Sequence, residues 1–134
     1  MITVSRASLT ISSITIDAAT MTRRLGIEPS SSPESRPDFD PRRHTRWILR
    51  LTDEVRGESE SQGGFASLRE LLDTVLPRVA ELESLRAEGC EVSLWWSGDA
   101  DSDQGSFNMS PAIIRDLARL DLDLRGTVNV ASGD

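Results

Sequence analysis

The sequence contains one cysteine, one histidine and no lysine among its 134 residues. Since Cys90 has no second cysteine to pair with, an internal disulfide and a cysteine-based zinc site are both excluded. Cys90 follows Gly89 and begins a predicted strand, which favours a buried structural thiol over the alternative of a reactive one. Repeated histidine or cysteine ligands and a glycine-rich phosphate loop are also missing, so we predict neither a metal site nor a cofactor.

A long apolar run is lacking as well. No stretch approaches the roughly 18 residues that a membrane-spanning helix needs, and the N-terminus is not a basic segment followed by an unbroken apolar one. We therefore expect a cytoplasmic protein without membrane contact. The 37% of hydrophobic and 28% of charged residues are spread along the chain, which is typical of one globular domain over residues 1–134.

Positive charge is scarce in the second part of the chain. Residues 1–56 contain nine arginines against seven acidic residues, a net charge of +2, whereas residues 57–134 contain six against fifteen, a net charge of −9. An acidic protein repels the phosphate backbone of nucleic acids, so we expect no general nucleic-acid binding. A protein partner with a basic surface is the easier match.

Local patterns predict strands and helices in the order β-α-β-α-β-β-α-β. Period-two alternation or short apolar runs predict strands at 4–12, 45–52, 91–96, 106–109 and 122–130. Helical spacing of apolar residues predicts helices at 17–25, 67–88 and 111–120, with a kink at Pro77 in the second. Asp17 and Ser110 are residue types that cap a helix N-terminus, and Gly26 suits the position after a helix.

Two polar segments separate these elements. Residues 29–43 hold four prolines and four serines, which predicts a mobile surface loop. Residues 98–105 are an acidic turn, which we expect to join strands 91–96 and 106–109 into a hairpin. The predicted fold class is α+β, a mainly antiparallel five-stranded sheet covered on one face by helices, with a ferredoxin-like or related layout.

Taken in order, several short segments resemble a bacterial family of small proteins that is known only as a domain of unknown function. The segments are Ala7 to Ile11, Leu25 to Pro29, the strand around Trp47, Glu88-Gly89, and Met109 to Pro111 ahead of Leu117 and Leu120. The resemblance covers nearly the whole chain. It implies a compact α+β fold and a role as an immunity or defence-related protein. It carries over no functional residue, because the family has no established active site.

Acidic residues alternate in the predicted turn at Asp99, Asp101 and Asp103. Carboxylates spaced in this way begin a calcium-binding loop, in which the sixth position is glycine and the twelfth is a glutamate. Here these positions are Gln104 and Ser110. We therefore predict a solvated acidic turn and assign no metal to it.

The neighbouring Trp95 and Trp96 point to opposite faces of their strand. One indole belongs to the core, and the other faces solvent, a second layer or a partner, where exposed tryptophan is enriched in binding hot spots. Core packing of both indoles is the other interpretation. The predicted partner-binding residues are Asp99, Asp101, Asp103, Trp95 and Trp96.

A basic cluster offers an alternative site on and beside the loop at 29–43. Its members are Arg36, Arg42, Arg43 and Arg46, together with Trp47. Guanidinium groups suit carboxylates and phosphates, so this cluster predicts binding of an anion. Pairing of the arginines with the protein's own acidic residues is the competing interpretation. His44 has no positioned partner in the sequence, so we interpret it as a surface histidine.

Two functions therefore remain open. The first is a non-catalytic protein-binding module, such as an immunity protein or an inhibitor, whose acidic surface meets a basic partner. The alternative is a domain that senses a small anionic ligand or a nucleotide through the arginine-rich segment near Trp47. No enzyme is predicted, and the sequence assigns no oligomeric state.

Overall fold

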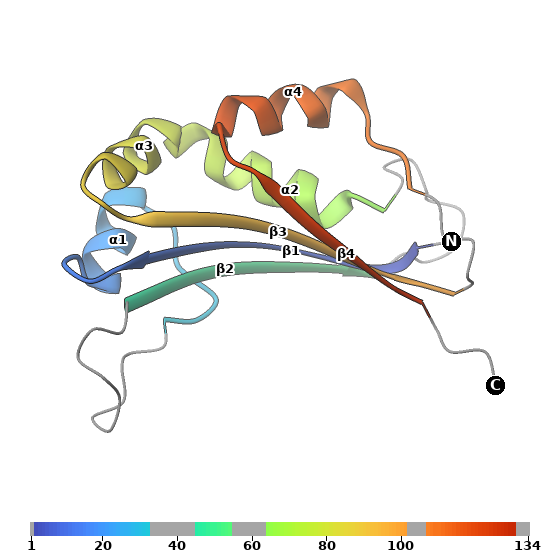
Figure 1. The fold of residues 1–134 in the computed structure, drawn as a ribbon, viewed down its shortest axis with the longest axis horizontal. Coiled ribbons are helices and arrows are strands. Elements are labelled where there is room, and N and C mark those ends of the chain that lie inside the picture. The colour runs from blue at the N-terminus through green and yellow to red at the C-terminus, as the bar shows by residue number, and fades with distance from the viewer. Residues whose placement is uncertain (1, 33–44, 55–63, 102–106, 131–134) are drawn as a thin grey trace.

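The computed structural model describes residues 2–32, 45–54, 64–101 and 107–130, and Figure 1 shows their arrangement. The elements are β1 (Ile2–Ser13), α1 (Ala18–Leu25), β2 (Thr45–Glu54), α2 (Ala66–Val75), the 3-10 helix η1 (Leu76–Arg78), α3 (Val79–Ala87), β3 (Glu91–Ala100), α4 (Pro111–Leu120) and β4 (Leu124–Val130). Helices α2, α3 and α4 lie over one face of the sheet (Figure 1). No helix of the described part covers the opposite face, which we call the open face.

Within the described residues, the sheet has four strands in the order β2-β1-β3-β4. The central strand β1 is antiparallel to both of its neighbours, so that Leu9 lies opposite Leu49 of β2 and Leu94 of β3. Strand β4 runs parallel to β3. Parallel neighbours need a crossover connection, and α4 provides it between the two strands.

The prediction of five mainly antiparallel strands is wrong, and so is the predicted hairpin. The segment at 91–96 does not end in a turn but continues as β3 to Ala100, which pairs with Ile2 of β1. Residues 107–109 form no strand, and Ser106 lies outside the described residues. The cause is the length of β1, whose backbone pairs with Gly98 and Asp99 and keeps them extended although both residue types favour turns.

Several local predictions about the helices are confirmed. The Asp17 side chain accepts a hydrogen bond of 2.8 Å from a backbone N–H in the first turn of α1, and Gly26 follows the helix with a φ of 69°. Ser110 caps α4 in the same way, at 3.3 Å. The helical segment after β2 is interrupted at Pro77, where η1 separates α2 from α3.

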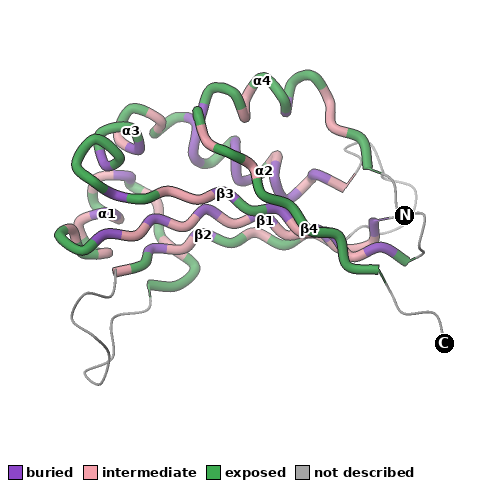
Figure 2. Tube along the Cα trace, viewed as in Figure 1, coloured by how far each residue is buried: buried purple, intermediate pink, exposed green. Residues whose placement is uncertain are grey.

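The buried hydrophobic side chains form one cluster between the sheet and the helices (Figure 2). Trp47 of β2 is fully buried, and its Nε1 donates a hydrogen bond of 3.0 Å to Oγ1 of Thr22, which fastens α1 to the sheet. A salt bridge of 2.6 Å from Arg69 to Asp116 joins α2 to α4. Cys90 is buried at the start of β3, which confirms the prediction of a buried thiol.

None of the helices described here is both long and apolar enough to cross a membrane. Most of the predicted loop at 29–43 lies outside the described residues. Of its described part, Ser31 forms an isolated antiparallel bridge with Ile48 of β2.

Candidate binding face

The open face is built by the outward-facing positions of the four strands. Along β3, Leu94 and Trp96 point into the core, whereas Trp95 between them is 39% exposed. The same alternation along β1 buries Ala7 and Leu9 and leaves the residues between and beside them on the other face. The open face therefore carries the residues between the buried positions, most of them polar, with Val4, Ile48 and Trp95 among the apolar ones.

The central row of the open face crosses all four strands. Arg50 of β2 pairs with Ser8 of β1, Ser8 with Trp95 of β3, and Trp95 with Arg125 of β4. We call these four residues the Trp95 row. The Cζ atom of Arg125 lies 5.4 Å from the centroid of the Trp95 ring, which is within range of a cation–π interaction. This contact orients the exposed indole ring.

A charge pair lies diagonally across β1 and β3 on the same face, since Arg6 is opposite Ser97 and Asp99 is opposite Val4. The Arg6 guanidinium donates hydrogen bonds of 3.2 and 2.8 Å to the two carboxylate oxygens of Asp99, and the Asn129 side chain donates a third of 3.3 Å. These hydrogen bonds, that from Arg6 above all, hold the pKa of Asp99 below its usual value. The carboxylate is therefore charged at neutral pH, and its charge is largely balanced by Arg6.

A hollow of about 280 Å³ lies beside the Trp95 row. Its lining includes Arg6, Ser8, Arg50, Trp95, Ser97 and Thr127. An aromatic ring on one side, guanidinium groups on the other and hydroxyl groups between them form a lining that suits a planar or apolar group attached to an anion. Within the described residues, no carboxylate forms a salt bridge with Arg50.

The charge of this face differs in sign from that of the whole chain. Among the residues described, the open face presents Arg6, Arg46, Arg50 and Arg125, whereas its acidic positions include Asp99 and Glu91. The chain as a whole carries a net charge of −7. Arg46 lies in the row of Glu91 and Arg6 is paired with Asp99, so Arg50 and Arg125 of the Trp95 row are the two arginines that create a local field attracting anionic groups.

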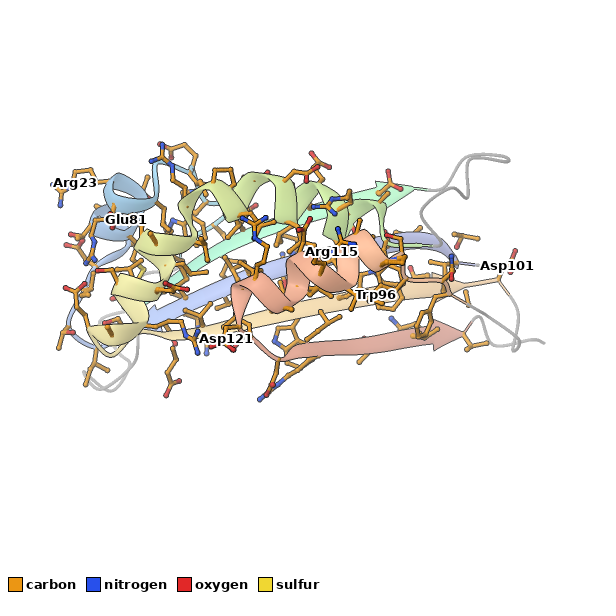
Figure 3. All side chains as sticks on the ribbon, turned by 90° about the horizontal axis from the view of Figure 1, so that it is seen from above. Arg23, Glu81, Trp96, Asp101, Arg115 and Asp121 are labelled. Carbon is orange, nitrogen blue, oxygen red and sulfur yellow. The ribbon has the colours of Figure 1, made fainter. Side chains whose placement is uncertain are left out.

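The predicted partner-binding residues are only partly brought together. Trp95 and Asp99 share the open face, but Trp96 is 3% exposed and points into the core, where its Nε1 donates a hydrogen bond of 3.1 Å to the Gly64 carbonyl. Figure 3 shows Trp96 near α4 and Asp101 at the end of β3. Asp103 lies outside the described residues.

The residues of the predicted anion site are not gathered around Trp47. That indole is 0% exposed and belongs to the core. Arg46 is exposed at the start of β2, and Arg36, Arg42 and Arg43 lie outside the described residues. Across the described part of the chain, no three His, Cys, Asp or Glu side chains are grouped so that they could hold a metal ion.

The sequence interpretation missed Arg6, Arg50 and Arg125 as members of a site. A signal was present for all three, because each arginine alternates with mainly apolar residues of its strand and therefore points to the opposite face. Their proximity to Trp95 could not be inferred from the sequence, because it depends on the order of the strands in the sheet.

The fold and this face define a small α+β domain with a mixed sheet, helices on one side and an arginine- and tryptophan-bearing face on the other. The chain belongs to the family described as "Domain of unknown function (DUF4279)", which it matches over residues 3–130. No curated protein and no solved structure matched the chain in the corresponding searches.

Proposed function

We propose that this protein is a binding module that holds an acidic segment of another protein on the open face of its sheet. One observation carries the proposal. The Trp95 row places a 39%-exposed indole between two arginines, Arg50 and Arg125, on a face that no described helix covers.

Exposed tryptophan and arginine are the residue types most enriched among the energetically dominant contacts of protein interfaces. Trp95 offers a large apolar surface whose orientation is already restricted by Arg125, so little freedom is lost when a partner covers it. The hollow beside it is partly open to solvent, and its lining spans all four strands. Such a surface suits an extended segment of a macromolecule.

The charges on the open face determine that the bound segment carries negative charge. Carboxylates can pair with Arg50 and Arg125 in bidentate geometry at a local site. A long polynucleotide would also meet the field of the whole chain, whose net charge is −7. A short acidic stretch of a protein meets mainly the arginine-rich face.

This proposal retains the role of a protein-binding module and changes the charge of the partner. A basic partner was expected from the acidic residues at 99–103, but the Asp99 carboxylate is engaged by Arg6 and Asn129. A more specific version of this proposal is that the protein acts in the cytoplasm as an immunity protein or an inhibitor. It is supported by the resemblance noted in the sequence and not by any contact in the structure.

The test is a selection from a displayed library of random peptides on the folded, immobilised protein. We expect peptides enriched in Asp and Glu around an apolar residue, with affinity that weakens as salt is added. The same selection is run on the double variant Trp95→Ala with Arg50→Ser. The acidic peptides should lose at least tenfold in affinity for this variant.

The matched control is Arg115→Ser, which removes an exposed arginine from α4 on the helix side (Figure 3). It should bind the selected peptides like the unaltered chain. Enrichment of basic peptides, equal binding by the double variant, or tighter binding of a single-stranded oligonucleotide than of any acidic peptide would each refute the proposal.

The hollow supports a second candidate function, the binding of a small planar anion. The ring would stack on Trp95 and the anion would meet Arg50, so this candidate site lies on the open face and not around the buried Trp47. Trp95 is the exposed member of the three tryptophans, so quenching of fluorescence by acrylamide reports mainly on it. Adenosine monophosphate should protect Trp95 from acrylamide, and unchanged quenching at saturating nucleotide would exclude this candidate.

A further inference from the structure

The two edges of the sheet are protected to different degrees. At the β2 edge, the backbone N–H groups of Ser31 and Ile48 each donate to the carbonyl of the other, at 3.2 and 3.0 Å. The Ser30 hydroxyl accepts a hydrogen bond of 2.8 Å from the Arg50 N–H on the same edge. At the outer edge of β4, no backbone hydrogen bond joins the strand to another described segment.

Strand β4 also lacks the features that usually keep an edge from pairing. Among Leu124–Val130, the only charged side chain is that of Arg125, proline is absent, and the register with β3 runs without a bulge. Val128 and Val130, on the helix side of the strand, are 39% and 48% exposed. Figure 2 shows the exposed residues running along the strand.

We propose that the outer edge of β4 binds the same edge of a second copy of this chain, antiparallel and about a twofold axis at Thr127. A twofold contact requires a strand that complements itself. In this register the exposed Val128 lies opposite Gly126 of the second copy, where its side chain has room, and the half-buried Leu124 lies opposite the exposed Val130.

The charges support the same register. Arg125 lies opposite Asn129 of the second copy and not opposite another arginine, and Asn129 already donates to the Asp99 carboxylate at 3.3 Å. The register therefore brings no two like charges together. The pairing forms one continuous sheet in which the two open faces, each with its Trp95 row, lie on the same side.

A cysteine at the axis tests the register. In a Cys90→Ala background, Thr127→Cys should form a covalent dimer under mild oxidation, because opposed residues of an antiparallel pair have Cα atoms about 4.5 to 5.5 Å apart, within the range of a disulfide. The matched control is Thr52→Cys, exposed on the open face of β2. Oxidation at least tenfold faster at 127 than at 52 supports the pairing, and similar rates overturn it.

Sedimentation of the full chain provides a second measurement that needs no cross-link. The unaltered protein should show twice its chain mass of 14.7 kDa at high concentration. Val128→Lys should return it to the single-chain mass, while Ile114→Lys, an exposed apolar position on α4, should leave it dimeric. A monomer at every concentration, or a Val128→Lys variant that associates like the unaltered chain, would overturn the proposal.

Discussion

The close approach of Gly98 to Trp96 allows a sharp test of the packing beneath the open face. A Cβ atom added at Gly98 would lie 2.7 and 2.9 Å from two ring atoms of Trp96 and 3.2 Å from the Cδ1 atom of Ile2. The first two distances are shorter than side-chain carbon atoms tolerate. The indole is buried, so it cannot turn away without displacing its neighbours.

We therefore expect Gly98→Ala to lower the free energy of unfolding by about 1 to 3 kcal/mol, the usual cost of adding a methyl group to a filled core. Gly126→Ala is the matched control on the adjacent strand. Its added Cβ would lie 3.6 Å from the same ring, an ordinary contact. Its effect should stay within about 0.5 kcal/mol, as for most exposed positions.

Urea unfolding followed by circular dichroism measures both variants under the same conditions. For a domain of this size, the loss at Gly98 corresponds to a fall of several degrees in the melting temperature, at roughly 4 °C per kcal/mol. The unfolding slope with urea should stay unchanged, because the exposed area does not change. Equal stability of Gly98→Ala and Gly126→Ala would refute the placement of Trp96 against Gly98.

Three further predictions concern single side chains. In urea titrations, Trp95→Ala should lower the free energy of unfolding by about 1 kcal/mol, whereas Trp96→Ala should lower it by about 3 to 5 kcal/mol; equal losses would contradict the assigned faces. Because Arg6 lowers the pKa of Asp99 below 3.8, the stability that Asp99 adds is present above that pH and lost as the pH falls through the lowered pKa. Thermal melts should thus show Asp99→Asn less stable than the unaltered chain at pH 7, with the difference vanishing in acid; a constant difference would speak against the ion pair. Burial raises the pKa of the Cys90 thiol, so iodoacetamide at pH 8 should label it much more slowly in the folded protein than in urea, and equal rates would show that the thiol is accessible.

The sequence predicted elements well where their signals are local. The cap at Asp17, the break at Pro77 and the start of α4 at Ser110 all depend on contacts within a few residues, and each lies where it was predicted. The strand at 91–96 was also predicted, but its end was not. Gly98 and Asp99 have the residue types of a turn and lie in a strand because β1 pairs with them.

The candidate site was predicted only in part, because its members come together across strands. The alternation at 95 and 96 correctly indicated one indole on each face, yet nothing local distinguishes the two. Helices on one side of the sheet bury Trp96 and leave Trp95 exposed. Arg50 reaches the Trp95 row only because β1 separates β2 from β3.

The sequence by itself determined the helices with their ends, most strands, the buried thiol and the α+β class, since apolar periodicity and capping act over a few residues. The tertiary structure alone decided the number and direction of the paired strands, the open face and its arginine-rich surroundings. Strand partners are chosen by contacts between residues far apart in the chain, and a period-two pattern is compatible with many partners. The parallel pairing of β4 with β3 is the clearest case, because the pattern of Leu124–Val130 would equally fit an antiparallel neighbour.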